Sequence, residues 1–276
     1  MVSMTGNNPM TRLNNGNMMP LLGLGVYNMF GKEAENAVMD ALQIGYRLID
    51  TAAMYHNETE IGNAVKSSTV PRKEIFITTK VNNMDQGYDS TLQAFDQSLK
   101  KLQTDYIDLY LIHWPIKGKR KQTWQALEKI YASGKSKAIG VANYLVPFLD
   151  ELNGYAQIVP ALNQVEFSPY LFPQNLLDYC KARNIILQAY SPLIRGKRMN
   201  DPRLVNLAKK YGKTTAQIIL RWDIELGVSP IPKSVNPERL KENFDIFDFH
   251  LDREDIDYLK TFDEKLRVAD DPMIFL

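Results

Sequence analysis

The stretch RLIDTAAMYHNE, residues 47–58, contains a strand, a loop and the beginning of a helix. Leu48 and Ile49 form a short apolar strand, and NETEIGNAVKSS, residues 57–68, has the pattern of an amphipathic helix. The loop between them carries an aspartate and a tyrosine five residues apart, Asp50 and Tyr55. The stretch therefore predicts one strand-then-helix unit with an acid and a phenol at the connection.

The same unit recurs along the whole chain. Eight short apolar strands each precede a helix-length amphipathic segment, and no linker or low-complexity stretch divides them. Such α/β repeats indicate a parallel sheet, and eight of them in about 250 residues predict a (β/α)8 TIM barrel. We therefore expect a single domain over residues 1–276. The strands are expected at residues 21–25, 47–50, 75–80, 106–114, 137–142, 161–167, 184–190 and 228–234.

Two glycine-containing segments refine this architecture. Asn15-Gly16 stands between apolar flanks, which is the pattern of a tight turn, so a β-hairpin should precede the barrel. The alternative architecture is an open doubly wound sheet with a glycine-rich dinucleotide-binding turn. GLGVY, residues 23–27, disfavours it because the segment lacks the third glycine and the helix start of that fingerprint.

The composition limits the kinds of partner. The net charge is +1, so no overall field attracts nucleic acid or an anionic membrane surface. No apolar stretch reaches the roughly 18 residues that a membrane helix needs. Cys180 is the only cysteine, which excludes an internal disulfide and a thiolate zinc site. The N-terminus shows no targeting pattern, and nothing demands more than a monomer, so we expect a cytoplasmic monomer that binds neither nucleic acid nor membranes.

Polar side chains stand at or near the ends of almost every expected strand. The carboxyl ends of barrel strands meet at one rim, where such barrels carry their chemistry. Lys80 could be only a solvated strand end, and His113 a satisfied core histidine. Asp50 could cap its loop, and Tyr55 could be a rim aromatic. Their convergence on one rim favours a functional site. The strands deliver Asp50, Lys80, His113, Asn143, Gln164, Tyr190, Lys233 and Ser234.

Four of these side chains suggest a reaction. A metal site would rest on His113 and Asp50, but a lysine in the cluster disfavours a divalent cation. A Schiff-base Lys80 remains open, yet it leaves the tyrosine without a role. If Tyr55 donates a proton, a nearby Lys80 would stabilise the phenolate and lower a pKa that is about 10 for a free phenol. Asp50 would hold Lys80, and neutral His113 would orient a carbonyl oxygen, which predicts carbonyl reduction by a hydride cofactor.

The segment IPKSVNPERLKENF, residues 231–244, predicts where that cofactor binds. Asn236 is a good helix N-cap and Pro237 suits the first helical position. Lys233 and Arg239 lie on either side of this helix start, so the site should hold an anion. A diphosphate that is also bound by backbone amides does not need two cations to balance its charge. The pattern favours a cofactor with a further phosphate, NADPH/NADP+, over NAD.

The chain resembles the aldo-keto reductase family over essentially its whole length. The resemblance rests on GLGVY, DTAAMYHNE, ITTKV, DLYLIHWP, IGVANY, LNQVEFSPY, AYSPL and IPKSVNPERLKEN, in this order and spacing. The short loops are similar to those of microbial and protozoan members such as diketogluconate reductases and prostaglandin F synthases. The resemblance implies an NADP(H)-binding (β/α)8 barrel with a catalytic tetrad of Asp50, Tyr55, Lys80 and His113.

The same resemblance implies further roles. Asn143 and Gln164 would hold the nicotinamide carboxamide, and Tyr190 would stack on the ring. Tyr27 and Trp114, with His113, would line the substrate pocket. The pyrophosphate and adenosine sites would be lined by Ser191, Leu193, Lys233, Ser234, Val235, Arg239, Glu242 and Asn243.

Two departures from the family pattern bear on function. Ala142 replaces the serine that usually precedes the asparagine of the fifth strand, which removes one carboxamide hydrogen bond of about 1 kcal/mol. The C-terminal tail RVADDPMIFL and the loop IRGKRMND are short, which favours an open pocket for varied small carbonyl compounds. We expect NADPH-dependent reduction of aldehydes and ketones. The alternative is a nicotinamide-sensing regulatory module with little turnover, like the related channel β subunits.

Overall fold

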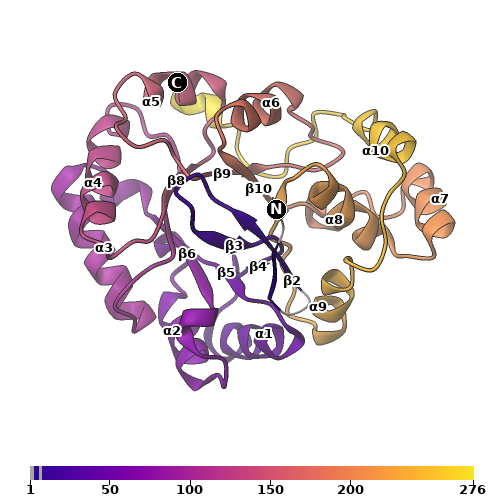
Figure 1. Ribbon diagram of the computed structural model, residues 1–276, viewed down its shortest axis with the longest axis horizontal. Helices are drawn as coiled ribbons and strands as arrows, with labels where there is room; N and C mark the ends of the chain where they lie inside the picture. Colours follow the sequence, from indigo (N-terminus) through magenta and orange to yellow (C-terminus); the bar gives the residue numbers. More distant parts are fainter. Residues whose placement is uncertain (1–2, 6–7) are drawn as a thin grey trace.

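A sheet of eight parallel strands, β4 to β11, forms the centre of the computed structural model, which describes residues 3–5 and 8–276. The strands lie in the sheet in the same order as in the chain. Figure 1 shows the helices arranged around these strands. The strands are β4 (Leu24–Gly25), β5 (Leu48–Asp50), β6 (Phe76–Val81), β7 (Leu109–Ile112), β8 (Ile139–Ala142), β9 (Leu162–Glu166), β10 (Ile186–Tyr190) and β11 (Ser229–Pro230).

Backbone hydrogen bonds join the first and last strands and close the sheet into a barrel. Gly23 N donates to Pro230 O and Gly25 N donates to Pro232 O, each over 3.1 Å. The contact is tight, because a Cβ atom at Gly25 would lie 2.8 Å from the carbonyl oxygen of Ile231. The predicted (β/α)8 barrel is therefore confirmed, and the open-sheet alternative is wrong.

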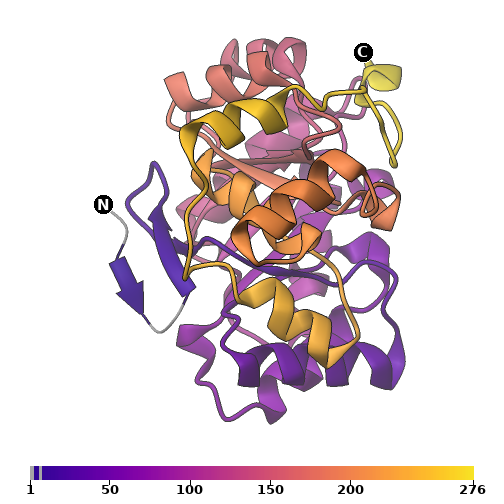
Figure 2. The same cartoon turned by 90° about the vertical axis from the view of Figure 1, so that its right-hand side faces the viewer.

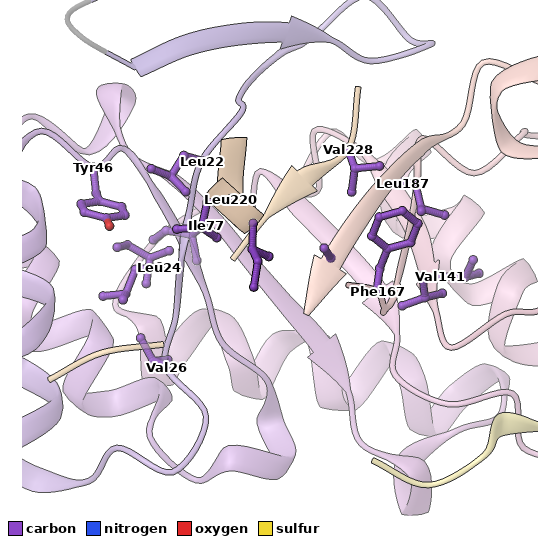
Figure 3. Packing of buried hydrophobic residues seen from close by; sticks show 14 of the residues in the cluster. Leu22, Leu24, Val26, Tyr46, Ile77, Val141, Phe167, Leu187, Leu220 and Val228 are labelled. Atoms are coloured by element: carbon purple, nitrogen blue, oxygen red, sulfur yellow. The ribbon is translucent and has the colours of Figure 1, made fainter. Parts of the chain in front are cut away.

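Helices cover the outside of the barrel and bury the outward-facing strand residues. In α1, for example, Ala34, Val38 and Ala41 lie on the buried face, and Gly45 ends the helix with a positive φ of 126°. Figure 3 shows Leu24, Ile77, Val141 and Leu187 from the strands in this layer, with Leu220 from α8. The helices are α1 (Gly31–Ile44), α2 (Glu58–Ser67), α3 (Tyr88–Leu102), α4 (Arg120–Ala132), α5 (Val146–Asn153), α6 (Gln174–Ala182), α7 (Pro202–Tyr211), α8 (Thr215–Glu225), α9 (Pro237–Phe244) and α10 (Arg253–Lys260).

An N-terminal hairpin covers the end of the barrel where the strands begin. Its strands β2 (Asn8–Arg12) and β3 (Met18–Pro20) are antiparallel, and β1 (Ser3–Thr5) pairs with β2. The side chains of Asn15 and Asn17 donate to the carbonyl oxygen of Lys137, just before β8. Figure 2 shows this hairpin and the C-terminal segment at opposite ends of the molecule. The predicted hairpin is confirmed, and it leaves the other end of the barrel free for chemistry.

The interior of the barrel changes from apolar to polar along its axis. A second buried cluster fills the end near the hairpin, and its members come from both the hairpin and the inward positions of the strands. Nearer the carboxyl ends several inward positions are polar, among them Asp50, Lys80 and Gln164, whereas Ala142 stays apolar. The apolar cluster contains Leu13, Met19, Leu48, Phe76, Leu109, Leu111, Ala138, Ala142, Ala161, Leu162 and Ile231. Within the described ranges no helix is long and apolar enough to cross a membrane.

Helix α8 carries a carboxyl group that is buried in the protein interior. Asp223 is fully buried, and neither of its carboxylate oxygens has a hydrogen-bond partner among the described residues. Burial raises the pKa of Asp223 well above its ordinary value. The folded chain thus binds the Asp223 proton more tightly than the unfolded chain does. The stability that this protonation supplies is fully present below the pKa that Asp223 has in the unfolded chain. It is lost as the pH rises through the higher pKa that Asp223 has in the folded chain.

We therefore expect Asp223→Asn to stabilise the protein, and to do so more at pH 8 than at pH 5. The amide needs no proton to stay neutral, so the substitution removes a cost that grows by about 1.4 kcal/mol for each pH unit above the pKa of Asp223 in the unfolded chain. Each kcal/mol is worth about 2–4 °C in the melting temperature of a chain of this size. Thermal unfolding followed by circular dichroism at both pH values would measure the difference. An equal change in melting temperature at pH 5 and pH 8 would contradict this account of Asp223.

Candidate active site

A buried ion pair lies inside the barrel near its open rim. Lys80 on β6 and Asp50 at the end of β5 both point inward, and their side chains are 0% and 2% exposed. Lys80 Nζ lies 2.6 Å from Asp50 Oδ1 and donates to the carbonyl oxygen of Thr51 at 2.9 Å. Burial lowers the pKa of Lys80 and raises the pKa of Asp50, while the attraction between the two charges opposes both shifts. The alternative interpretation of Lys80 as a solvated strand end is wrong.

Tyr55 brings its phenol to this pair. It ends the 3-10 helix η1 (Ala53–Tyr55), the first turn of the loop after β5, and Lys80 Nζ lies 3.3 Å from its hydroxyl oxygen. Burial raises the pKa of Tyr55 well above 10, and the nearby Asp50 and Tyr27 raise it further. This differs from the expectation that Lys80 would lower that pKa. The physical reason is that Asp50 cancels much of the lysine charge, while burial disfavours the phenolate.

His113 follows β7 and faces the phenol. Its ring centroid lies 5.6 Å from that of Tyr55, at an angle of 75° between the ring planes. The side chain is 7% exposed, and burial together with the charge of Lys80 holds the pKa of His113 well below 6.5. Its Nδ1 atom has no hydrogen-bond partner among the described residues. The imidazole is therefore neutral at physiological pH and suited to donate a hydrogen bond to an uncharged carbonyl oxygen.

Three polar side chains from β8, β9 and β10 join the same rim. Asn143, with a positive φ of 63°, donates from Nδ2 to the carbonyl oxygen of His113 at 2.9 Å. The hydroxyl of Tyr190 donates to Asn143 Oδ1 at 2.8 Å. Gln164 donates from Nε2 to Asp50 Oδ2 at 2.7 Å. Ala142 is fully buried beside Asn143 and brings no hydroxyl to this part of the rim.

The start of α9 forms a separate part of the rim. The predicted cap is confirmed, because Asn236 Oδ1 accepts from Arg239 N at 3.0 Å and Pro237 takes the first helical position. Lys233 and Arg239 are exposed, and no ion pair is found for either among the described residues. Two exposed cations at a helix N-terminus are suited to bind phosphate groups.

Of the other predicted cofactor residues, Ser234 and Val235 precede α9, Glu242 and Asn243 lie in its last turn, and the remaining two follow β10. Ser234 is 8% and Asn243 4% exposed, whereas Val235 is 37% exposed. Glu242 Oε1 accepts from the hydroxyl of Thr214 at 2.7 Å. Ser191 and Leu193 directly follow β10, and Ser191 has a positive φ of 50°. Among the described residues no hydrogen bond or ion pair joins any of these six side chains to Lys80 or Asp50, so they form a second group.

Aromatic rings and the C-terminal tail line the mouth. Tyr27 is 48% exposed, and its ring centroid lies 5.1 Å from that of Tyr55. Trp114 stacks beside His113 at 6.4 Å and contacts Phe275 at 5.7 Å. Arg120 donates to the carbonyl oxygens of Pro115 and Phe275, each at 2.9 Å. The short tail therefore folds back onto the wall that Trp114 forms.

A family model matches this chain over residues 21–264, and it is that of the Aldo/keto reductase family. The chain belongs to this family. Glyoxal reductase of Bacillus subtilis is 51% identical over 262 residues, which cover 95% of either chain. MGS-M4, an aldo-keto reductase from a Medee basin deep-sea metagenome library, is 48% identical with a TM-score of 0.92, covering 94% of this chain and 97% of that one. A mutant of Gox0644 in complex with NADPH is 37% identical with a TM-score of 0.92, covering 96% and 98%.

This aldo/keto reductase is thus an oxidoreductase, and the family resemblance seen in its motifs is confirmed. Among residues 3–5 and 8–276, no group of three or more His, Cys, Asp or Glu side chains is placed to hold a metal ion. The roles that the sequence predicts for the individual rim residues remain predictions.

Four residues at or behind the rim of this aldo/keto reductase were not among the site residues predicted from the sequence. The carbonyl oxygen of Thr51 anchors Lys80, and Phe275 extends the Trp114 wall. Gln188 and Ser229 continue the polar chain behind Gln164. A signal for Gln188 exists in NIILQAY, where it is polar and lies two residues before Tyr190, on the same strand face. No local pattern marks the others, because their partners are distant in the sequence.

Proposed function

We propose that this protein reduces small aldehydes and ketones to alcohols with NADPH as hydride donor and Tyr55 as proton donor. The observation that carries the proposal is the position of the Lys80 ammonium, which lies 2.6 Å from Asp50 and 3.3 Å from the Tyr55 oxygen. The ammonium beside this partly buried phenol would stabilise the phenolate that remains once the proton is transferred. The complex of a family relative with NADPH supports the choice of cofactor.

The side chains would divide the work as follows. NADPH, when bound, supplies the hydride for the carbonyl carbon. Tyr55 donates its proton to the carbonyl oxygen, and Lys80 then stabilises the phenolate through its ammonium. Asp50 keeps Lys80 charged and aimed, so it acts as a positioning residue. Neutral His113 donates to the same carbonyl oxygen and sets its direction towards the phenol.

The rim also fits the proposed cofactor. The side-chain oxygen Oε1 of Gln164 accepts no hydrogen bond from the described residues, so it is available for the amide hydrogens of a carboxamide. Asn143 would hold the other side of that group, and Tyr190 would stack on the ring. Lys233 and Arg239 at the start of α9 would bind phosphate groups, together with the backbone amides there. The surrounding Ser191, Leu193, Ser234, Val235, Glu242 and Asn243 would line the adenosine and pyrophosphate sites.

The substrate class follows from the walls of the mouth. Tyr27 and Trp114 are apolar rings with polar edges, and Phe275 adds a third ring. These walls suit small carbonyl compounds without demanding a charged group. The relationship to a glyoxal reductase supports short carbonyl substrates such as methylglyoxal. Comparable rates on aromatic, aliphatic and dicarbonyl substrates would support an open pocket, and strict selectivity for one of them would contradict it.

The direct test is loss of NADPH absorbance with methylglyoxal and nitrobenzaldehyde, repeated with NADH at the same concentration. We expect turnover with both substrates and a preference for NADPH. The alternative, a nicotinamide-sensing module, predicts tight NADPH binding without turnover on any carbonyl compound in a broad panel. Absence of both binding and turnover would contradict either function.

The pH dependence of reduction should be nearly flat from about pH 6 to about pH 9. The pKa of His113 lies well below 6.5, so the imidazole stays neutral as the pH falls towards 6. The pKa of Tyr55 lies well above 10, so the phenol keeps its proton as the pH rises towards 9. Initial rates at saturating NADPH and substrate would measure this profile. An acidic limb near pH 6.5 that disappears in His113→Gln would show that His113 titrates in its ordinary range.

A further inference from the structure

A chain of buried polar side chains crosses the barrel behind the ion pair. Gln164 Nε2 donates both to Asp50 Oδ2 and to Gln188 Oε1, each over 2.7 Å. Gln188 Nε2 in turn donates to the hydroxyl oxygen of Ser229 at 3.2 Å. All four side chains are no more than 2% exposed. This series of hydrogen-bonded side chains thus runs from Lys80 and Asp50 to residues on the opposite side of the barrel.

Strand register explains how these residues meet. Gln188 on β10 lies directly beside Gln164 on β9 and directly beside Ser229 on β11. Their side chains share the inward face of three neighbouring strands, so each can reach the next. Asp50 comes from β5, across the interior of the barrel. Only the closed barrel therefore brings the end of the Gln164 side chain to the carboxylate.

The contacts fix which way the Gln164 amide points. Its nitrogen has two hydrogens, and one is accepted by Asp50 and the other by Gln188. If the amide turned over, its oxygen would face the Asp50 carboxylate, and two acceptors would oppose each other. Gln188 Nε2 in turn donates to the hydroxyl oxygen of Ser229, so Gln188 Oε1 faces Gln164 as the acceptor. The side-chain oxygen Oε1 of Gln164 thereby accepts no hydrogen bond from the described residues.

We propose that Gln188 is a positioning residue that fixes the Gln164 amide. The fixed nitrogen satisfies the second oxygen of Asp50, and the fixed oxygen faces the cofactor carboxamide. One residue thereby supports both the buried ion pair and the nicotinamide end of the site. The inference rests on the proposed reduction with NADPH, since it names a residue that supports that reaction without touching substrate or cofactor.

The first test uses Gln188→Met, which keeps the length of the side chain but removes both of its hydrogen bonds. We expect kcat to fall by about 5–10-fold and NADPH binding, followed by fluorescence quenching, to weaken by about 3–10-fold, because one buried hydrogen bond is worth about 1 kcal/mol. The KM for methylglyoxal should stay within about twofold, since Gln188 does not contact the carbonyl compound. Ser229→Ala should shift kcat and NADPH binding in the same direction by a smaller factor.

Asn163→Leu is the matched control. Asn163 is a fully buried amide next to Gln164, but it points outward and donates to the carbonyl oxygen of Tyr144 at 2.7 Å. Its loss should lower the melting temperature as Gln188→Met does, yet leave kcat and NADPH affinity within about twofold. Gln188→Glu keeps an acceptor towards Gln164 and, when protonated, a donor towards Ser229. At pH 6 it should restore at least about half of the lost kcat.

A double-mutant cycle then separates positioning from general destabilisation. If Gln188 acts through Gln164, adding Gln188→Met to Gln164→Met should change kcat and NADPH affinity by less than about twofold. Fully additive losses would overturn the inference, and so would a Gln188→Met protein that matches Asn163→Leu in every measurement. If the wild-type protein reduces carbonyl compounds and Gln188→Met has the same kcat and NADPH affinity, this inference is overturned but the proposed function is not. A wild-type protein that neither binds NADPH nor turns over would overturn the proposed function as well.

Discussion

Tyr55→Phe should lower kcat for carbonyl reduction by about 10²–10⁴-fold, the range that a positioned general acid supplies. The substitution removes one hydroxyl and leaves the ring, so the contacts with Tyr27 and His113 remain. The Lys80 ammonium then has no phenolate to stabilise. NADPH affinity, measured by fluorescence quenching, should stay within about threefold, because Tyr55 is not expected to hold the cofactor.

Tyr110→Phe is the control for this change. The hydroxyl of Tyr110 is buried on the outer face of β7 and has no hydrogen-bond partner among the described residues. The same chemical substitution there should leave kcat within about twofold. Full activity of Tyr55→Phe would show that another group protonates the carbonyl oxygen. The assignment of Tyr55 as the acid would then be wrong, whatever the cofactor.

Lys80→Met should reduce both activity and stability. It removes the ammonium 3.3 Å from the Tyr55 oxygen, and loss of one such donor costs about 10²–10³-fold in kcat. It also leaves the Asp50 carboxylate buried without its counter-ion, which typically costs about 3–5 kcal/mol. Initial rates and urea unfolding, followed by circular dichroism, would measure the two effects on the same preparation.

The double variant Lys80→Met with Asp50→Asn separates the two effects. It removes both charges, and the amide oxygen of Asn at this position can still accept from Gln164. The free energy of unfolding should return towards that of the wild type, because no unpaired charge is left inside the barrel. Activity should stay low, since the ammonium is still missing. If activity returned together with stability, Lys80 would serve only as the partner of Asp50.

Lys80 and Asp50 are charged side chains of a kind that is normally excluded from a protein interior. A lysine and an aspartate are rarely buried this deeply unless they are paired, and a paired buried charge seldom adds stability over an apolar core. The barrel interior near the hairpin is filled with Leu, Ala and Phe side chains and shows what such a core looks like. The change to charged and amide side chains towards the rim therefore points to chemistry as the reason for keeping them.

Local patterns of the sequence determined a large part of this picture. Hydrophobic periodicity gave the eight strand-then-helix units, and Asn15-Gly16 gave the hairpin, because both depend only on neighbours in the chain. Asn236 and Pro237 marked the start of α9 for the same reason. The position of each strand end then placed Asp50, Lys80 and His113 at one rim, since parallel strands end on the same side.

Tertiary structure alone decided the electrostatics and the contacts across the barrel. The pKa of Tyr55 is raised rather than lowered, because burial and the nearby Asp50 both disfavour the phenolate, and neither burial nor distance can be read from spacing. The chain from Asp50 through Gln164 to Gln188 and Ser229 exists because closure of the sheet brings β5 opposite β9. RLIDTAAMYHNE thus predicted an acid and a phenol from the sequence alone. Only the closed barrel, through burial and neighbouring charges, determines the pKa values of Asp50 and Tyr55.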